Sequence, residues 1–201
     1  FTATPAGMVI NATTGEIDVS ASTLGSYTVT YTTSGACPTS MNVNVDITSI
    51  DDPSWSYTAG TDYCVGAANP IPTVTGTTGG TYSATPAGMT INATTGIIDL
   101  SATAAGVYNV MYTTGGACSA DSTIAITINA TPAITALTDT TVCGSYTLPA
   151  IGGTDLSGSE SYYDGAGGTG TAYAAGASIT SSMMLYIYDA NGTCTDETSL
   201  M

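Results

Sequence analysis

The 201-residue chain contains fifteen Asp and Glu residues and no Lys, Arg or His, which gives it a formal net charge of −15. Without imidazole bases, Schiff-base amines, Ser-His-Asp triads or arginine clamps, most enzyme classes are excluded, and we predict that the chain is not an enzyme. Nucleic acid is excluded as a partner as well, because binding to phosphate backbones depends mainly on Lys and Arg.

The rest of the composition predicts a folded all-β chain. Hydrophobic residues make up 43% of the chain and charged residues 7%, whereas disordered acidic tails combine low hydrophobicity with dense charge. The abundant Thr, Ser, Gly and Tyr favour strands and turns. Direct membrane insertion is not expected, because no apolar run approaches the roughly 20 residues that span a bilayer. The chain begins without a signal-peptide pattern, so we expect it to be a window of a longer protein.

The first predicted element is a hairpin at 5–18, "PAGMVINATTGEID", and it recurs 81 residues later at 86–99 as "PAGMTINATTGIID". Ile10 and Ile17 are expected in strands on either side of a turn that Asn11 opens and Gly15 closes with a positive φ. The phrase is either a site used twice or one piece of a copied domain. The same offset aligns many further positions without a gap, which favours a copied domain.

Next along the chain, "GSYTVTYTTSGAC" at 25–37 alternates Tyr27, Val29 and Tyr31 with Ser and Thr, the period-2 pattern of a half-buried strand. "GVYNVMYTTGGAC" at 106–118 repeats it. About seven such short strands per 80 residues predict tandem immunoglobulin-like β-sandwiches. We expect three domains: 1–50, truncated at its N-terminus, 51–130, and a divergent 131–201, truncated at its C-terminus.

Each predicted domain carries cysteines near its start, its end or both. We predict one intradomain disulfide per domain, which pairs Cys64 with Cys118 and Cys143 with Cys194 and leaves Cys37 with a partner upstream. The alternative is a set of free or metal-binding thiols, but the chain has neither a CxxC spacing nor a His to complete a zinc site. Disulfides imply an oxidising, extracellular compartment.

The stretch from Pro86 to Thr114 resembles bacterial immunoglobulin-like and cadherin-like repeats, although "DLSAT" stands where a Ser-Gly-Thr-Pro turn usually follows. Together with "LYIYDANGTCTDE" in the third domain, the pattern is similar to repeats of very large Bacteroidota cell-surface proteins, including gliding-motility adhesins. The resemblance implies export by type IX secretion, a place on the bacterial cell surface, and partners in the outer-membrane secretion and gliding machinery. It also implies O-glycans on Asp-Ser/Thr motifs, with Ser122 and Thr140 as weak matches.

Three groups of residues invite sharper hypotheses. Asp46, Asp51 and Asp52 cluster at the first domain junction and could bind calcium, since oxygen ligands suit this ion, or could be solvated charges. "GAGGTG" at 165–170 matches a dinucleotide fingerprint but is better explained as a hairpin loop. Glu160 and Asp164 could form a glycosidase pair, but solvent-facing acids are the stronger interpretation.

The predicted function is a structural stalk or filament segment of a long secreted adhesin, with the neighbouring repeats of the same chain as its partners. The alternative is a carbohydrate- or surface-binding module in which the third domain contacts a polysaccharide or a solid substrate. Aromatic residues are the candidates for that contact, because tyrosine and tryptophan combine an apolar ring with a polar atom: Trp55, Tyr57, Tyr162 and Tyr163.

Overall fold

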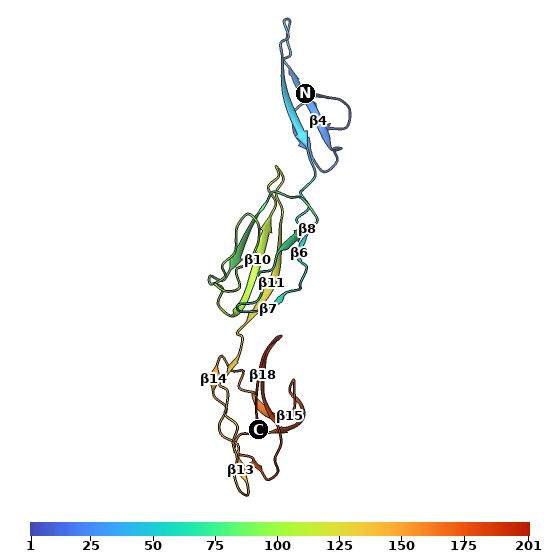
Figure 1. Cartoon of the computed structure of the whole chain (residues 1–201). Helices are drawn as coiled ribbons and strands as arrows, with labels where there is room; N and C mark the ends of the chain where they lie inside the picture. Colours follow the sequence, from blue (N-terminus) through green and yellow to red (C-terminus); the bar gives the residue numbers. More distant parts are fainter. The chain divides into compact units, whose positions relative to one another are not determined.

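The computed structural model describes residues 1–201 as β-strands, turns and loops without a helix, which confirms the all-β prediction (Figure 1). Accordingly, it offers no helix that is long and apolar enough to cross a membrane. Contacts group the chain into two units, one of Phe1–Asp52 with Gly116–Ala120 and one of Pro53–Gly115 with Asp121–Met201. Below, the ranges 1–50, 51–130 and 131–201 are called the first, second and third repeat.

The first unit holds one three-stranded antiparallel sheet of order β1-β4-β5 and a two-stranded hairpin, β2-β3. The Tyr27 and Ile47 side chains are buried on the sheet. Tyr31, on β4, is 46% exposed, and its ring lies 4.8 Å from that of Phe1. The five strands are β1 (Thr2–Thr4), β2 (Val9–Ile10), β3 (Ile17–Asp18), β4 (Gly25–Thr32) and β5 (Ser40–Ile47).

The hairpin at 5–18 forms as predicted. The Asn11 side-chain oxygen accepts a hydrogen bond from the Thr13 N–H at 2.9 Å, and Gly15 closes the turn with φ 77°. The second copy is the same, with Asn92 in place of Asn11 and Gly96 at φ 69°. The recurring phrase is therefore a turn whose polar side chain is used by its own backbone.

The second repeat is a sandwich of a four-stranded sheet, β7-β11-β10-β9, and a two-stranded sheet, β6-β8. Its strands pair in the same register as those of the first repeat, since Gly106 faces Ile128 as Gly25 faces Ile47. The two repeats therefore share the same antiparallel pairing of these strands. The strands are β6 (Trp55–Tyr57), β7 (Asp62–Cys64), β8 (Pro72–Val74), β9 (Thr81–Thr85), β10 (Gly106–Thr113) and β11 (Asp121–Asn129).

An aromatic cluster fills the core between these two sheets. The Trp55 ring lies 5.3 Å from that of Tyr57, 5.4 Å from that of Tyr82 and 6.3 Å from that of Tyr112, measured between centroids. Edge-to-face rings at such distances stabilise a core beyond their buried area. Tyr112 is 1% exposed beside the Trp55 ring, whereas its counterpart Tyr31, whose ring lies 4.8 Å from that of Phe1, is 46% exposed.

The third repeat has a separate core, built from one four-stranded sheet, β16-β15-β18-β19, and two short pairs, β12-β14 and β13-β17. Leu148, Tyr162 and Ile187 are fully buried in it. The strands are β12 (Ala133–Ile134), β13 (Tyr146–Thr147), β14 (Gly153–Thr154), β15 (Ser161–Gly165), β16 (Thr169–Tyr173), β17 (Ser178–Ile179), β18 (Leu185–Asn191) and β19 (Cys194–Leu200).

The "GAGGTG" stretch is the loop of the β15–β16 hairpin, as the sequence analysis favoured. Gly165 pairs with Thr169 across it, and Gly167 and Gly168 have φ of 70° and 66°. A second strand follows the loop instead of the helix that a dinucleotide site requires. The glycines therefore serve the turn.

Candidate functional site

The structure contains a single disulfide, Cys64–Cys194, with Cα atoms 5.6 Å apart and a sequence separation of 130 residues. Cys37, Cys118 and Cys143 are free thiols. The prediction of one disulfide inside each domain, Cys64 with Cys118 and Cys143 with Cys194, is therefore wrong. The bond joins the second repeat to the third.

Strand pairing explains why Cys64 and Cys118 cannot meet. β7 runs parallel to the end of β11, which places Cys64 beside Asn129. Cys118 lies in the loop that leads into the first residue of β11, Asp121. The nine residues of β11 separate the two ends by roughly 27 Å, whereas disulfide Cα atoms lie within about 7 Å. The two cysteines of this repeat therefore lie at opposite ends of its sheet.

The same geometry holds in the third repeat. Cys194 is the first residue of β19, while the chain before Cys143 is bound at the other end of this strand, where the Thr140 N–H donates to the Met201 carbonyl at 2.9 Å. The seven residues of β19 span roughly 20 Å. Cys143 is consequently exposed and unpaired.

The β18–β19 hairpin tip that carries Cys194 packs closely on the end of the second repeat. Cys194 is 2% exposed, and its sulfur lies 3.9 Å from the carbonyl oxygens of Tyr63 and Asn129. Gly192 has φ 61°, and a Cβ there would lie 2.6 Å from the Asn129 side-chain nitrogen, so any other residue would have to displace the Asn129 side chain. The disulfide is part of a packed junction.

Hydrogen bonds brace the segment that connects the two cores. The Thr131 hydroxyl donates to the Val65 carbonyl at 2.9 Å, and the Ile134 N–H donates to the Asp196 carboxylate at 2.6 Å. Pro132, between them, is buried. These contacts and the disulfide fix the second and third cores to each other on both sides of the connection.

Three of the four aromatic residues proposed as ligand contacts are core residues, which corrects that prediction. Trp55 and Tyr57 are 7% and 5% exposed, and Tyr162 is fully buried. The Tyr57 hydroxyl donates to the Gly96 carbonyl at 2.6 Å, and burial raises the pKa of Tyr57 well above its usual range. Only Tyr163 is partly accessible.

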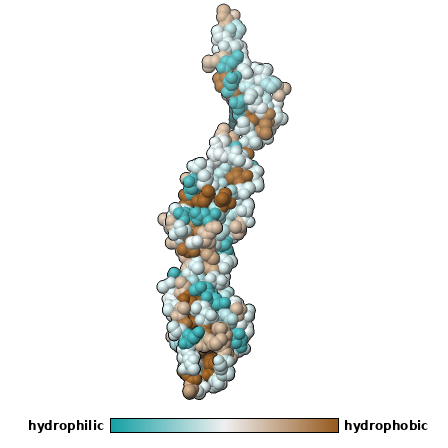
Figure 2. Space-filling model, in the orientation of Figure 1, coloured by the Kyte–Doolittle hydropathy of each residue, from teal (hydrophilic) through white to brown (hydrophobic).

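Sequence reasoning missed two tyrosines on the same outer face as Tyr163. Tyr186 and Tyr188 alternate along β18 with the buried Leu185 and Ile187, and the Tyr188 ring lies 6.2 Å from that of Tyr163. The period-2 pattern in "LYIY" carries this information, because alternate residues of a strand face opposite sides. On the face drawn in Figure 2, hydrophobic residues reach the surface in several separate patches.

The three aspartates considered as possible calcium ligands do not form a metal-binding group. No group of three or more acidic, Cys or His side chains in the chain is placed to hold a metal ion. The Asp51 carboxylate instead accepts a hydrogen bond from the Gly116 N–H at 3.0 Å. Asp46 lies on β5, paired with Ser26, while Asp52 follows in the connecting segment.

One member of the carboxylate pair of the third repeat, Asp164, stabilises a hairpin. Asp164 accepts a hydrogen bond from the Thr171 N–H at 2.6 Å across the β15–β16 hairpin, and this bond holds the pKa of Asp164 below its usual range. Glu160 has one buried carboxylate oxygen without a hydrogen-bond partner.

The two weak glycosylation matches differ in accessibility. Ser122 is half-buried in β11, where its carbonyl accepts a hydrogen bond from the Trp55 indole at 3.2 Å. Thr140 is exposed. Glycosylation at these residues stays a prediction.

Asp99 provides a test of the hairpin electrostatics. The Ser101 hydroxyl and N–H donate to its carboxylate at 2.7 and 3.0 Å, which lowers the pKa of Asp99 below its usual 3.8. A lowered folded-state pKa contributes stability above pH 3.8 that is lost as pH falls through the folded-state pKa. Asp99→Asn keeps an acceptor but removes the charge.

We expect the difference in urea midpoint between wild type and Asp99→Asn to be largest at neutral pH and to shrink as pH falls below about 4. Titration of the other carboxylates affects both proteins equally and cancels in this difference. A difference that stays constant from pH 7 to pH 2 would contradict the assignment.

The sequence matches no protein-family model and no curated protein. Solved structures of tandem cadherin repeats superpose on it loosely, among them "Crystal structure of human CDH23 EC21-23" at 13% identity, covering 96% of this chain and 80% of that chain, with a TM-score of 0.31. Mouse Cadherin-23 EC22-24 has 15% sequence identity, and the match covers 98% of this chain and 81% of that chain with a TM-score of 0.36. Protocadherin gammaB7 EC3-6 has 11% sequence identity, and the match covers 99% of this chain and 66% of that chain with a TM-score of 0.32. Superpositions this loose carry no functional inference, and the fold assignment rests on the strand pairing.

Proposed function

We propose that the chain is a segment of a repeat array outside the cell that transmits tension, the stalk or filament of a very large secreted adhesin. The observation that carries the proposal is the Cys64–Cys194 disulfide, which ties two consecutive cores together. An adhesin stalk must transmit force between the cell and whatever the adhesin grips. A covalent connection between repeats is suited to this task, whereas a disulfide inside one core would leave the connection between cores unprotected.

The bond changes the path that tension takes through the chain. Force that enters at the N-terminal side reaches Cys64, crosses the disulfide and continues from Cys194, so the residues between them carry none of it through the backbone. That loop contains β8 to β11 and β12 to β18, the main strands of both cores. Neither core can be pulled out to full length while the bond is intact.

Single-molecule stretching from the two chain ends tests this function. The 130-residue separation of Cys64 and Cys194 hides roughly 450 Å of extended chain. We expect the oxidised chain to fall short of the reduced chain's final extension by about that length. A Cys64→Ala/Cys194→Ala double variant should reach full extension under both conditions. Equal extensions of oxidised and reduced wild type would contradict the proposal.

The location follows from the same chemistry. Disulfides persist in oxidising, extracytoplasmic compartments, so we place the protein outside the cytoplasm. The bacterial cell surface, export by type IX secretion and a part in gliding motility are the finer proposal, supported by the sequence resemblance alone. A non-enzymatic role agrees with the absence of basic side chains and with aromatic residues that serve the cores.

A second candidate function is binding of a polysaccharide or a solid surface by the third repeat. It is favoured by the outer face of β15 and β18, where Tyr163, Tyr186 and Tyr188 are partly accessible. Tyrosine rings on a rigid sheet are suited to stacking against sugars. Binding to polysaccharides that is lost in Tyr186→Ala but kept in Tyr31→Ala, an exposed tyrosine of the first unit, would support this function.

A further inference from the structure

Three tyrosine rings stand together on the outer face of the third repeat's four-stranded sheet. Tyr163 on β15 is the direct partner of Tyr186 on β18, and Tyr188 lies on the same side of β18 with its ring 6.2 Å from that of Tyr163. Paired residues have Cβ atoms roughly 5 Å apart, and residues i and i+2 of a strand lie roughly 7 Å apart. The three residues therefore form one cluster, called here the tyrosine face.

The hydroxyls of the tyrosine face make no hydrogen bond within the chain, and each of the three residues is partly exposed. Tyrosines of the two cores use their hydroxyls differently. The Tyr57 hydroxyl donates to the Gly96 carbonyl at 2.6 Å, and the Tyr162 hydroxyl donates to the Pro149 carbonyl at 3.0 Å. The polar atoms of the tyrosine face are therefore free for a ligand.

The neighbours of the paired rings in the same row of the sheet are small. Ala172 on β16 pairs with Tyr163, and Ser199 on β19 pairs with Tyr186. The side chains of alanine and serine are too short to cover an aromatic ring. Tyr163 and Tyr186 therefore rise above the residues on either side of them.

The tip of the β15–β16 hairpin borders the tyrosine face at Tyr188. The Gly167 N–H donates to the Oε2 of Glu197, the residue that pairs with Tyr188 across β18 and β19. A Cβ on Gly168 would lie 2.6 Å from the Tyr188 ring, so the backbone of the tip lies close against this ring. One Glu197 oxygen thus holds the tip, and the other is left to accept a hydrogen bond from a ligand.

The chemistry of this surface selects a neutral ligand. The outward residues of β18 and β19 include no large aliphatic side chain and are Tyr186, Tyr188, Ala190, Thr195, Glu197 and Ser199. Aromatic rings with free hydroxyls suit sugars, which have C–H groups on the faces of their rings and hydroxyls at the edges. An acidic sugar would be repelled by Glu197 and by a chain with fifteen acidic and no basic residues.

We propose that the tyrosine face binds a neutral, ribbon-like polysaccharide of the β-1,4-glucan kind. Its sugar rings stack on Tyr163 and Tyr186, and one of its hydroxyls donates to Glu197. A flat ribbon is favoured over a coiled polysaccharide because the rings stand in a row on a sheet. The inference rests on the second candidate function above and names the class of its ligand and the residues that bind it.

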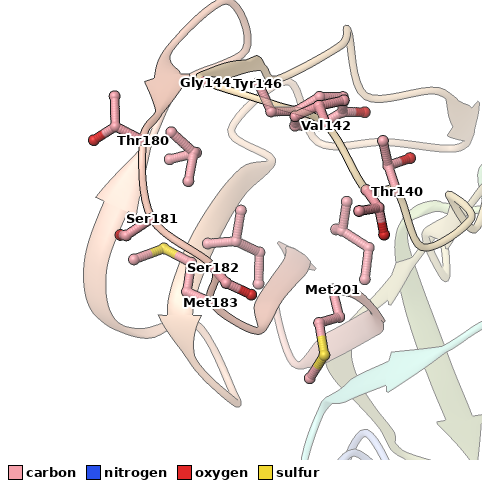
Figure 3. Close-up of a pocket in the computed structure, with 13 residues that line it drawn as sticks. Thr140, Val142, Gly144, Tyr146, Thr180, Ser181, Ser182, Met183 and Met201 are labelled. Atoms are coloured by element: carbon pink, nitrogen blue, oxygen red, sulfur yellow. The ribbon is translucent and has the colours of Figure 1, made fainter.

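A cavity of about 460 Å³ in the same repeat is separate from the tyrosine face (Figure 3). Tyr146, Ser182 and Met183 are among the residues that line it, and the three tyrosines of the face are not. A substitution that fills this cavity is therefore a control for the place of binding.

Native affinity electrophoresis of the 201-residue chain tests the proposal, since a net charge of −15 carries the chain to the anode without detergent. The gels contain hydroxyethylcellulose or carboxymethylcellulose, which share a β-1,4-glucan backbone and differ in charge. We expect retardation by hydroxyethylcellulose and none by carboxymethylcellulose. Tyr186→Ala should weaken the retardation at least several-fold, and Tyr186→Trp should retain it.

Two control variants, Tyr31→Ala in the first unit and Ser182→Trp in the cavity, should be retarded like wild type. The tyrosine face is overturned if hydroxyethylcellulose does not retard the wild type, if Tyr186→Ala is retarded as strongly, or if Ser182→Trp alone loses binding. Retardation by carboxymethylcellulose alone would overturn the neutral ligand and leave the second candidate function standing. The stretching result depends on Cys64 and Cys194, so the transmission of tension is tested separately.

Discussion

Replacing Cys64 and Cys194 by alanine together is expected to lower the free energy of unfolding of the second unit by about 4 kcal/mol. The bond closes a loop with a sequence separation of 130 residues, and the chain-entropy model assigns roughly 5 kcal/mol to a loop of that length. Engineered disulfides often deliver less than the model predicts, and removal of a native disulfide typically costs roughly 2 to 5 kcal/mol. Urea unfolding followed by the fluorescence of Trp55, the only tryptophan, measures the loss in the second repeat directly.

The matched control is Cys37→Ala/Cys143→Ala, which removes two exposed free thiols and should leave the urea midpoint unchanged. Wild-type protein unfolded in the presence of a reducing agent should behave like the Cys64→Ala/Cys194→Ala variant. If reduction and the double substitution both leave the midpoint where it was, the junction does not depend on the disulfide.

Gly96→Ala is expected to cost about 3 kcal/mol of stability in the second repeat. Gly96 has φ 69°, and a Cβ there would lie 2.7 Å from Pro72 and 2.8 Å from the Tyr82 ring. The left-handed conformation costs an alanine roughly 1 to 2 kcal/mol, and forcing atoms into a filled core adds roughly 1 to 3 kcal/mol. Thermal or urea unfolding with Trp55 as the probe measures the sum.

Gly66→Ala is the control for the conformational part of this cost. Gly66 has φ 79°, close to that of Gly96, but a Cβ there would meet nothing within 4 Å. We expect a loss of only about 1 kcal/mol. Equal losses of stability in Gly96→Ala and Gly66→Ala would contradict the claim that a Cβ at position 96 clashes with Pro72 and the Tyr82 ring.

Local pattern was enough to predict most of the fold. The turn at Asn11 and Gly15 depends on residues within the turn itself, and the alternation of Tyr108, Val110 and Tyr112 records which face of β10 is buried. The gapless 81-residue offset predicted that the two repeats have equivalent strands. Strands β4-β5 and β10-β11 indeed pair in the same register.

The disulfide and the aromatic site could not be predicted in this way, because both depend on pairings between distant strands. Cys64 lies far from Cys118 only because β7 runs parallel to β11, and no local pattern in "DYC" encodes that partner. Trp55 follows a junction and resembles an exposed aromatic, yet β6 places it over Tyr82 and Tyr112. A position next to a domain junction therefore does not show that a side chain is exposed.

Disulfide mapping of the unreduced chain tests most directly the claim that consecutive repeats are covalently joined. The absence of Lys and Arg rules out trypsin, but cleavage before Asp separates all five cysteines and places Cys64 in 62–98 and Cys194 in 189–195. The account predicts that mass spectrometry finds these two peptides linked. Peptide 62–98 linked to 99–120, or 139–154 linked to 189–195, would restore intradomain pairing and contradict it.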